Sequence, residues 1–213
     1  MKNLNLKIST FFMMAALVAA PAFAGISQAD DKANPLALTS NDVVLGDADA
    51  PVTMIEYASM TCGHCAHFHT DTFPQIKKNY IETGKIRFVL RDMPWDTLAT
   101  AVTKITRCVP DDEFYNYASA FLSTQQSWVR SNDPIAELKK VARLGGMDEA
   151  KFDSCLVDPA IHNEVLENRT VAIEQLKVSA TPTFFIGDEI VVQGALPYEE
   201  LAKKIDQALA DAK

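Results

Sequence analysis

Two cysteines separated by two residues are the strongest chemical signal in this sequence. Cys62 and Cys65 lie in the stretch SMTCGHCAHFHT, residues 59–70, with His64 between them. A Cys-x-x-Cys pair can form a reversible disulfide. Its first thiol ionises readily at the beginning of a helix, because unpaired N–H groups and the helix dipole stabilise an anion there. The spacing therefore predicts a redox dithiol in which Cys62 is the reactive sulfur.

The histidines that follow leave a metal site as an alternative. Cys65 and His69 are four residues apart and His67 lies close by, so a Cys/Cys/His/His zinc cluster can be imagined. A closed zinc site usually takes its two ligand pairs from well-separated parts of a chain. In a helix, residues 67 and 69 project to different faces and cannot converge on one ion. We therefore predict no metal, and interpret His67 and His69 as ordinary polar residues of the helix.

The elements around the dithiol are typical of a strand, a helix and a second strand. VTMIEY, residues 52–57, is rich in residues that favour strands, and so is KIRFVL, residues 85–90. The stretch between Cys62 and Gly84 has helical spacing, and Pro74 should kink or split that helix. This βαβ unit places Cys62 at the junction of the first strand and the helix.

The rest of the chain changes from helices back to strands. Residues 96–178 contain several helical segments and no convincing strand, and most of these helices begin with Asp, a good N-cap. Strands return at 183–187 and 189–194, and a final amphipathic helix covers 197–212. The predicted fold is α/β: a four-stranded sheet in the order βαβ…ββα with an inserted all-helical domain. The expected boundaries are residues 42–95 and 179–213 for the sheet domain and 96–178 for the insertion.

The first 24 residues have the organisation of an export signal. Lys2 and Lys7 accompany a short apolar core, residues 8–20, and the small residues of AFA end the segment at Ala24. The core is too short to span a bilayer comfortably. We expect cleavage after Ala24 and a soluble periplasmic protein that begins with a flexible leader, residues 25–41.

The charge of the chain excludes one class of partner. The formal net charge is −8 at pH 7, and no basic run interrupts the sequence. A protein of this kind is a poor ligand for nucleic acid or for an anionic membrane surface.

Three separate motifs resemble the thioredoxin superfamily, and within it the DsbA-like disulfide oxidoreductases. IEYASMTCGHC, residues 55–65, is similar to the strand and active-site start of that family. TPTF, residues 181–184, resembles its cis-proline loop, and GALPYEEL, residues 194–201, resembles its closing turn and helix. The helical insertion also lies where this class carries one. The resemblance implies a thioredoxin fold over nearly the whole chain after the signal.

The resemblance also implies roles for the residues of the dithiol. Cys62 would be the nucleophile that forms a mixed disulfide with a client protein, and Cys65 would be the resolving partner. Gly63 and His64 would tune the pair, because a histidine there can stabilise the thiolate and make the disulfide more oxidising. The Gly-His dipeptide matches that of disulfide isomerases, which are milder oxidants.

Three residues outside the dithiol take roles from the same resemblance. Pro182 would follow a cis peptide bond and face the disulfide. The backbone of Thr181 could pair with an extended client segment, as an added strand does. Glu56 lies where the family places a buried acid that can pass a proton to Cys65. A satisfied acid at the protein surface is the alternative for Glu56.

The remaining cysteines, Cys108 and Cys155, each fall in a predicted helix of the insertion. Four cysteines allow three pairings, which the sequence alone does not distinguish. Because an oxidising compartment favours disulfides, we predict a structural bond between Cys108 and Cys155. Two buried thiols, or a relay with the first pair, are the alternatives.

The predicted function is that of an exported thiol:disulfide oxidoreductase that introduces disulfides into client proteins, with no cofactor beyond the Cys62–Cys65 disulfide. The expected partners are unfolded or newly exported proteins and a membrane quinone-linked protein that reoxidises the dithiol. Because little chain precedes the first strand, we expect no dimerisation domain and therefore a monomer. The alternatives are an isomerase or reductase of the same fold, and a metal-binding or chaperone module.

Overall fold

The structure is a computed structural model that describes residues 34–187 and 190–213 of the 213-residue chain. Three predicted features lie outside the described residues. They are the signal peptide at residues 1–24, the leader over residues 25–33, and the turn at residues 188–189.

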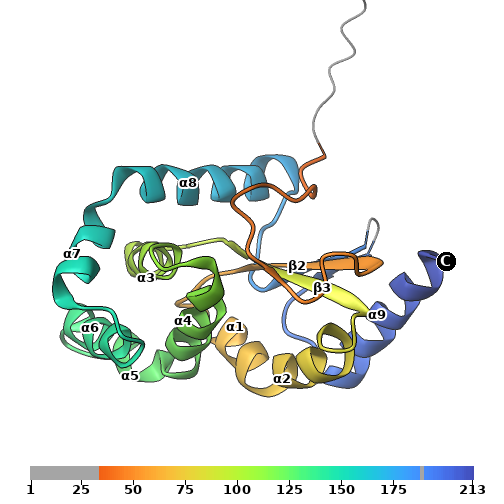
Figure 1. Cartoon of the computed structure of the whole chain (residues 1–213), viewed down its shortest axis with the longest axis horizontal. Helices are drawn as coiled ribbons and strands as arrows, with labels where there is room; N and C mark the ends of the chain where they lie inside the picture. Colours follow the sequence, from red (N-terminus) through yellow and green to blue (C-terminus); the bar gives the residue numbers. More distant parts are fainter. Residues whose placement is uncertain (1–33, 188–189) are drawn as a thin grey trace, which may run out of the picture. The chain divides into compact units, whose positions relative to one another are not determined.

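A five-stranded sheet lies at the centre of the described chain (Figure 1). The predicted parallel pair is present as β2, Val52–Ala58, and β3, Ile86–Asp92. Antiparallel strands extend the sheet on both sides, in the order β1-β3-β2-β4-β5. They are β1, Val44–Leu45, β4, Thr183–Ile186, and β5, Ile190–Gln193. The prediction of four strands was wrong by one, because two residues of β1 are too few to show a strand pattern.

One helical run leads from the dithiol to β3. It consists of α1, Gly63–His67, the π-helical turn η1, Phe68–Thr72, α2, Phe73–Ile76, and the π-helical turn η2, Lys77–Ile81. Pro74 stands at the start of α2. Pro74 was predicted to kink or split this helix; the helical run is not split there, and a π-helical turn, η1, precedes α2.

The elements between β3 and β4 are all helical, as predicted. They are α3, Thr97–Arg107, α4, Asp111–Ser123, α5, Gln125–Val129, α6, Pro134–Leu144, α7, Glu149–Val157, α8, Pro159–Thr170, and η3, Val171–Gln175. Four of them begin with an aspartate whose carboxylate accepts a first-turn N–H: Asp96, Asp133, Asp148 and Asp158. The last helix is α9, Tyr198–Asp211. In the part of the chain that the structure describes, no helix has both the length and the apolar character that a membrane crossing requires.

Alternation along β2 divides the core into two sides. Met54 and Ala58 face a large apolar cluster that includes residues of the helical run after Cys62 and of α9, whereas Ile55 and Tyr57 face a smaller cluster with Ala172 of η3. Figure 1 shows α1, α2 and α9 on one side of β2 and β3, and α8 on the other. Because successive strand side chains point to opposite faces, Glu56 faces the large cluster and the helix that carries the dithiol.

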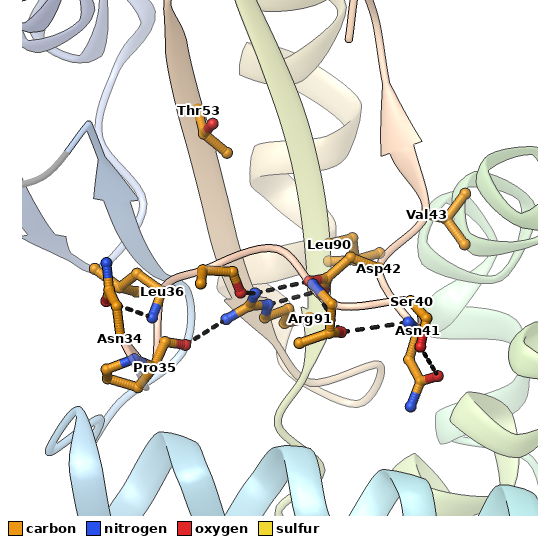
Figure 2. A network of polar contacts seen from close by, with 12 residues as sticks. Asn34, Pro35, Leu36, Ser40, Asn41, Asp42, Val43, Thr53, Leu90 and Arg91 are labelled. Atoms are coloured by element: carbon orange, nitrogen blue, oxygen red, sulfur yellow. Dashed lines mark hydrogen bonds and ion pairs between the residues drawn. The ribbon is translucent and has the colours of Figure 1, made fainter. Parts of the chain in front are cut away.

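A buried arginine fixes the chain before β1 to the sheet (Figure 2). The guanidinium of Arg91 binds the carboxylate of Asp42 at 2.7 and 2.9 Å, and donates to the carbonyl oxygens of Pro35 and Ala37, both at 2.8 Å. A guanidinium has five N–H donors, so Asp42 alone cannot satisfy it. Residues 34–41, which we predicted to belong to a flexible leader, are therefore held against the sheet.

We expect Arg91→Met to lower the free energy of unfolding by roughly 3–5 kcal/mol, because it leaves the buried carboxylate of Asp42 without its partner. Urea unfolding measures the loss. Arg87→Met is the matched control, since Arg87 lies on the same strand but is only half-buried and binds Thr53 and the Ala48 carbonyl. Equal losses in the two variants would contradict the anchoring role of Arg91.

Within the insertion, Cys108 and Cys155 form a disulfide with a Cα–Cα distance of 5.8 Å. Cys108 follows the last residue of α3, and Cys155 lies buried in α7. The bond therefore ties together two helices of the insertion that are 47 residues apart in sequence.

Replacing both cysteines, Cys108→Ala with Cys155→Ala, should lower the free energy of unfolding by about 4 kcal/mol. The reason is that the unfolded chain regains the entropy of an open loop of this length. Urea unfolding of the variant and the native protein measures the difference. A loss below about 1 kcal/mol would show that the bond does not stabilise the fold.

Candidate active site

Cys62 stands at the N-cap of α1, directly after the loop that follows β2. Its backbone is extended, with φ −76° and ψ 118°, and the helix begins at the next residue. No side chain caps this end of the helix, so the first N–H groups of α1 remain available to the sulfur. The side chain of Cys62 is half-buried, and its thiol donates to the carbonyl oxygen of Thr181 at 3.3 Å.

The surroundings of Cys62 favour a thiolate. The hydrogen bond from the Cys65 thiol is the largest cause that lowers the pKa of Cys62, from an ordinary value of 9.0 to about 5. Partial burial acts in the opposite direction, while the Thr181 side chain and the backbone N–H groups of Cys65 and His64 act in the same direction. At neutral pH the sulfur of Cys62 therefore carries a negative charge in the dithiol form.

Cys65 has the opposite character. It is completely buried, and burial is the main cause that raises its pKa well above the ordinary value of 9.0. The hydrogen bond to Cys62 and the negative charge of Glu56 raise the pKa further. At neutral pH the pair thus consists of one thiolate at the surface and one protonated thiol inside.

The residues predicted from the sequence around this pair are found in different settings. Gly63 is the first residue of α1, and a β-carbon placed on it would meet no atom within 4 Å, so the site has space for a side chain there. His64 is exposed between the cysteines. The Thr181–Pro182 peptide bond is cis, and it brings the Thr181 carbonyl to the sulfur of Cys62.

Glu56 and His69 form a buried pair, whereas we interpreted His69 as an ordinary polar residue of the helix. Glu56 has no exposed surface, and its Oε2 lies 2.7 Å from Nε2 of His69. Its Oε1 is the one completely buried side-chain oxygen or nitrogen without a hydrogen-bond partner among the described residues. The interpretation of His69 as an ordinary polar residue was wrong, because the helix turns it inward on the face of Cys65. A cysteine and a histidine four residues apart carried that signal.

His67, by contrast, is exposed and pairs with Asp71 at 2.8 Å, which agrees with its interpretation as an ordinary polar residue of the helix. The two histidines therefore point away from one another and from a common centre. Within residues 34–187 and 190–213, no group of three or more His, Cys, Asp or Glu side chains is placed to hold a metal ion.

Two further residues of the site were missed in the sequence. Trp95 follows β3 and donates its indole N–H to Oγ1 of Thr181 at 3.0 Å, while 44% of the residue stays exposed beside the dithiol loop. The signal was its position, because the carboxyl ends of the parallel strands β2 and β3 meet at one edge of the sheet. Gln125 of α5 donates to the carbonyl oxygens of Met60 and Cys62 at 2.8 and 2.9 Å, and no local pattern pointed to it.

These features define the thioredoxin fold with a helical insertion and a dithiol at its first helix. A Cys-x-x-Cys at the start of the first helix of a βαβ unit faces a cis-proline that precedes an antiparallel ββα unit, and a helical insertion lies between the two units. Nothing but the two sulfurs is required for chemistry of the disulfide-exchange type.

Comparison with known proteins agrees with this class. The family described as Thioredoxin matches residues 38–207, and the chain belongs to that family. It is similar to the crystal structure of alpha-DsbA1 from Wolbachia pipientis, with 31% identity and a TM-score of 0.78, over 83% of this chain and 95% of that one. A crystal structure named as a protein-disulfide isomerase from Novosphingobium aromaticivorans is 27% identical, with a TM-score of 0.69, over 81% of this chain and 99% of that one.

Relatives found by sequence point the same way. A Rickettsia prowazekii protein that is provisionally named a protein-disulfide oxidoreductase is 31% identical over 175 residues, which are 82% of this chain and 64% of that protein. The chain spans less than two thirds of the length of this relative and of its Rickettsia felis counterpart, where the share is 62%. The predicted DsbA-like thioredoxin fold is confirmed.

The low pKa of Cys62 leads to a pH-dependent stability that only the reduced protein should show. Between pH 5 and about pH 8.5 the folded state holds a thiolate while the unfolded state binds a proton, so stability rises with pH. The extra stability is complete above the unfolded pKa and is lost as pH falls through the folded pKa of about 5.

Urea unfolding of the reduced and oxidised proteins across this range measures the effect. The oxidised form lacks the thiols and serves as the control, since the other titrating groups are common to both forms. A difference between the two forms that stays constant from pH 5 to pH 8.5 would contradict a lowered pKa of Cys62.

Proposed function

We propose that this protein is an exported thiol:disulfide oxidoreductase that oxidises client proteins with its Cys62–Cys65 disulfide. One observation carries the proposal: the two sulfurs differ in exposure and in acidity in the way that directional exchange requires. Cys62 is accessible and has a pKa of about 5, lowered first by the Cys65 thiol, whereas burial keeps the pKa of Cys65 well above 9.0.

The reaction needs two exchange steps. A client thiolate attacks Sγ of Cys62, the Cys62–Cys65 bond breaks, and its electron pair leaves on Sγ of Cys65, which takes up a proton. A second client thiolate then attacks the client sulfur of the mixed disulfide, and the electron pair leaves on Sγ of Cys62. The client dithiol has lost two electrons and gained a disulfide, and the protein holds one thiol and one thiolate.

The stability of that final thiolate sets the direction of the reaction. Every interaction that lowers the pKa of Cys62 also stabilises the reduced protein, and a more stable reduced form makes the disulfide a stronger oxidant. This favours donation of disulfides over their reduction. The isomerase alternative stays open, because the Gly63–His64 dipeptide matches isomerases and one similar structure carries that name.

The cis-proline loop offers a place for the client. Thr181 presents its backbone beside Sγ of Cys62, where an extended client segment can add to the chain as a strand does. The half-exposed indole of Trp95 is held at the same place by the Thr181 hydroxyl, so an apolar surface lies next to the reactive sulfur. Neither contact depends on a particular client sequence, which fits a protein that acts on many unfolded chains.

Export and the partners complete the proposal. Residues 1–24 have the pattern of a cleaved signal, which would place the protein in the periplasm. There it would meet newly exported proteins as substrates and a quinone-linked membrane protein as its own oxidant. It would act as a monomer and without a cofactor.

The test is oxidation of a reduced, unfolded client by the oxidised protein. We expect stoichiometric disulfide transfer that Cys62→Ser abolishes, and a reduction potential toward the oxidising end of the range from about −270 to −120 mV that related proteins span. The double variant Cys108→Ala with Cys155→Ala is the control, and it should transfer disulfides at the native rate. A potential near −270 mV, or faster rescue of scrambled disulfides than formation of new ones, would show a reductase or an isomerase instead.

A further inference from the structure

The buried pair of Glu56 and His69 consists of two ionisable groups that the exchange steps at Cys62 do not explain. Burying an ionisable group costs free energy unless it is paired, and here one carboxylate oxygen is left without any partner. A fold that needed only packing at this point would place an apolar residue there, as it does with the neighbours Met54 and Ala58. The burial of Glu56 with an unpaired oxygen therefore indicates a functional role for the pair.

The pair and the resolving thiol belong to the same buried region. Cys65 and His69 lie four residues apart on one inward helix face, and both are buried. Glu56 points from β2 to the side of the sheet where Cys65 packs with Met54 and Ala58, and its negative charge is one cause that raises the pKa of Cys65. Oε2 of Glu56 is bound to His69, and Oε1 is left to exchange a proton.

The imidazole of His69 has a second ring nitrogen and a small exposed surface. Nε2 of His69 is bound to Glu56. Among the described residues, Oε1 of Glu56 is the one completely buried side-chain atom without a partner, so Nδ1 of His69 does not belong to that group. The side chain of His69 keeps 4% of its surface exposed. An imidazole can take a proton at one nitrogen and release one from the other, so it can join a buried carboxylate to the solvent edge.

The surroundings of the pair are otherwise mostly aromatic. The rings around His69 belong to Phe68, Phe73 and Phe88, at centroid distances of 5.2, 4.9 and 6.5 Å. The charge of Glu56 is among the causes that raise the pKa of Cys65 from α1 and of Tyr115 from α4. Burial first, with the Glu56 charge as a smaller cause, raises the pKa of Tyr115, so its hydroxyl stays protonated and does not compete for the proton.

We propose that His69 acts through Glu56 as the proton relay of the resolving cysteine, a positioning role that rests on the exchange function proposed above. When a client thiolate opens the disulfide, the electron pair leaves on Sγ of Cys65. A proton passes from Glu56 to that sulfur, and His69 returns a proton to Glu56 from the solvent edge. In the reverse step, Cys65 gives its proton to Glu56 and attacks Sγ of Cys62, and His69 carries the proton outward.

The two steps can be separated with a chromogenic aromatic disulfide added to the reduced protein. The first phase of thiol release reports attack by Cys62. The second phase reports proton loss from Cys65 and its attack on the mixed disulfide. His69→Gln keeps an N–H donor toward Glu56 but cannot carry a proton, and His67→Gln is the matched control on the exposed side of the same helical run.

We expect His69→Gln to leave the first phase unchanged and to slow the second phase about tenfold or more near pH 7. The deficit should shrink as pH rises, because the Cys65 thiol, whose pKa burial holds well above 9.0, then ionises without help. Glu56→Gln should slow the same phase with the same pH dependence. The double variant should be no slower than the slower single variant, because the two residues act in one path.

A second-phase rate lowered by the same factor at every pH, or by no more than in His67→Gln, would overturn the relay and leave a structural pair. If His69→Gln does not fold, Glu56→Gln provides the same readout, since its amide can still bind His69. Failure of the native protein to oxidise a reduced client, with the pH-dependent loss in the variants intact, would reject the proposed function and leave the relay standing. If the native protein oxidises a reduced client but the variants show no pH-dependent loss in the second phase, the relay is rejected and the proposed function stands.

Discussion

The chemistry of this protein depends on the unequal surroundings of two neighbouring sulfur atoms. Cys62 lies at the open end of a helix, where the Cys65 thiol above all, and backbone N–H groups to a smaller extent, stabilise negative charge and lower its pKa to about 5. Cys65 lies one turn further along, where burial above all raises its pKa. Two thiols with equal surroundings would have no preferred nucleophile and no preferred direction of exchange. The strand-to-helix junction creates the difference.

Segments distant in sequence hold that junction in place. The cis-proline loop places the Thr181 carbonyl at the Cys62 sulfur, and Gln125 from the insertion binds the backbone on either side of Thr61. Two buried ionisable residues, Arg91 and Glu56, point to opposite faces of the sheet. Arg91 uses its donors to fasten the chain before β1, and it is fully satisfied, whereas Glu56 on the dithiol side keeps an unpaired oxygen. The first arrangement is typical of a structural role, and the second of a functional one.

Much of the fold could be predicted because its signals are local. Strand-forming runs, helical spacing and aspartate caps depend on residues within one or two turns of each other, and four helices of the insertion have an aspartate cap. The same holds for the dithiol, whose spacing and position after a strand define it. One error lies where a local pattern was too short, as in β1 with two residues. Another lies in residues 34–41, a polar segment that was interpreted without its distant partner Arg91.

The sequence by itself therefore determined the order of elements, the reactive pair and the position of the cis-proline. Only the tertiary structure decided which distant groups surround that pair. His69 was interpreted as an ordinary polar residue of the helix, but β2 places Glu56 against it. Residues 34–41 were predicted to be part of a flexible leader, but β3 places Arg91 beside them. The physical reason is that burial and long-range hydrogen bonds depend on which strands pair and which helix faces pack inward. No window of neighbouring residues contains that information.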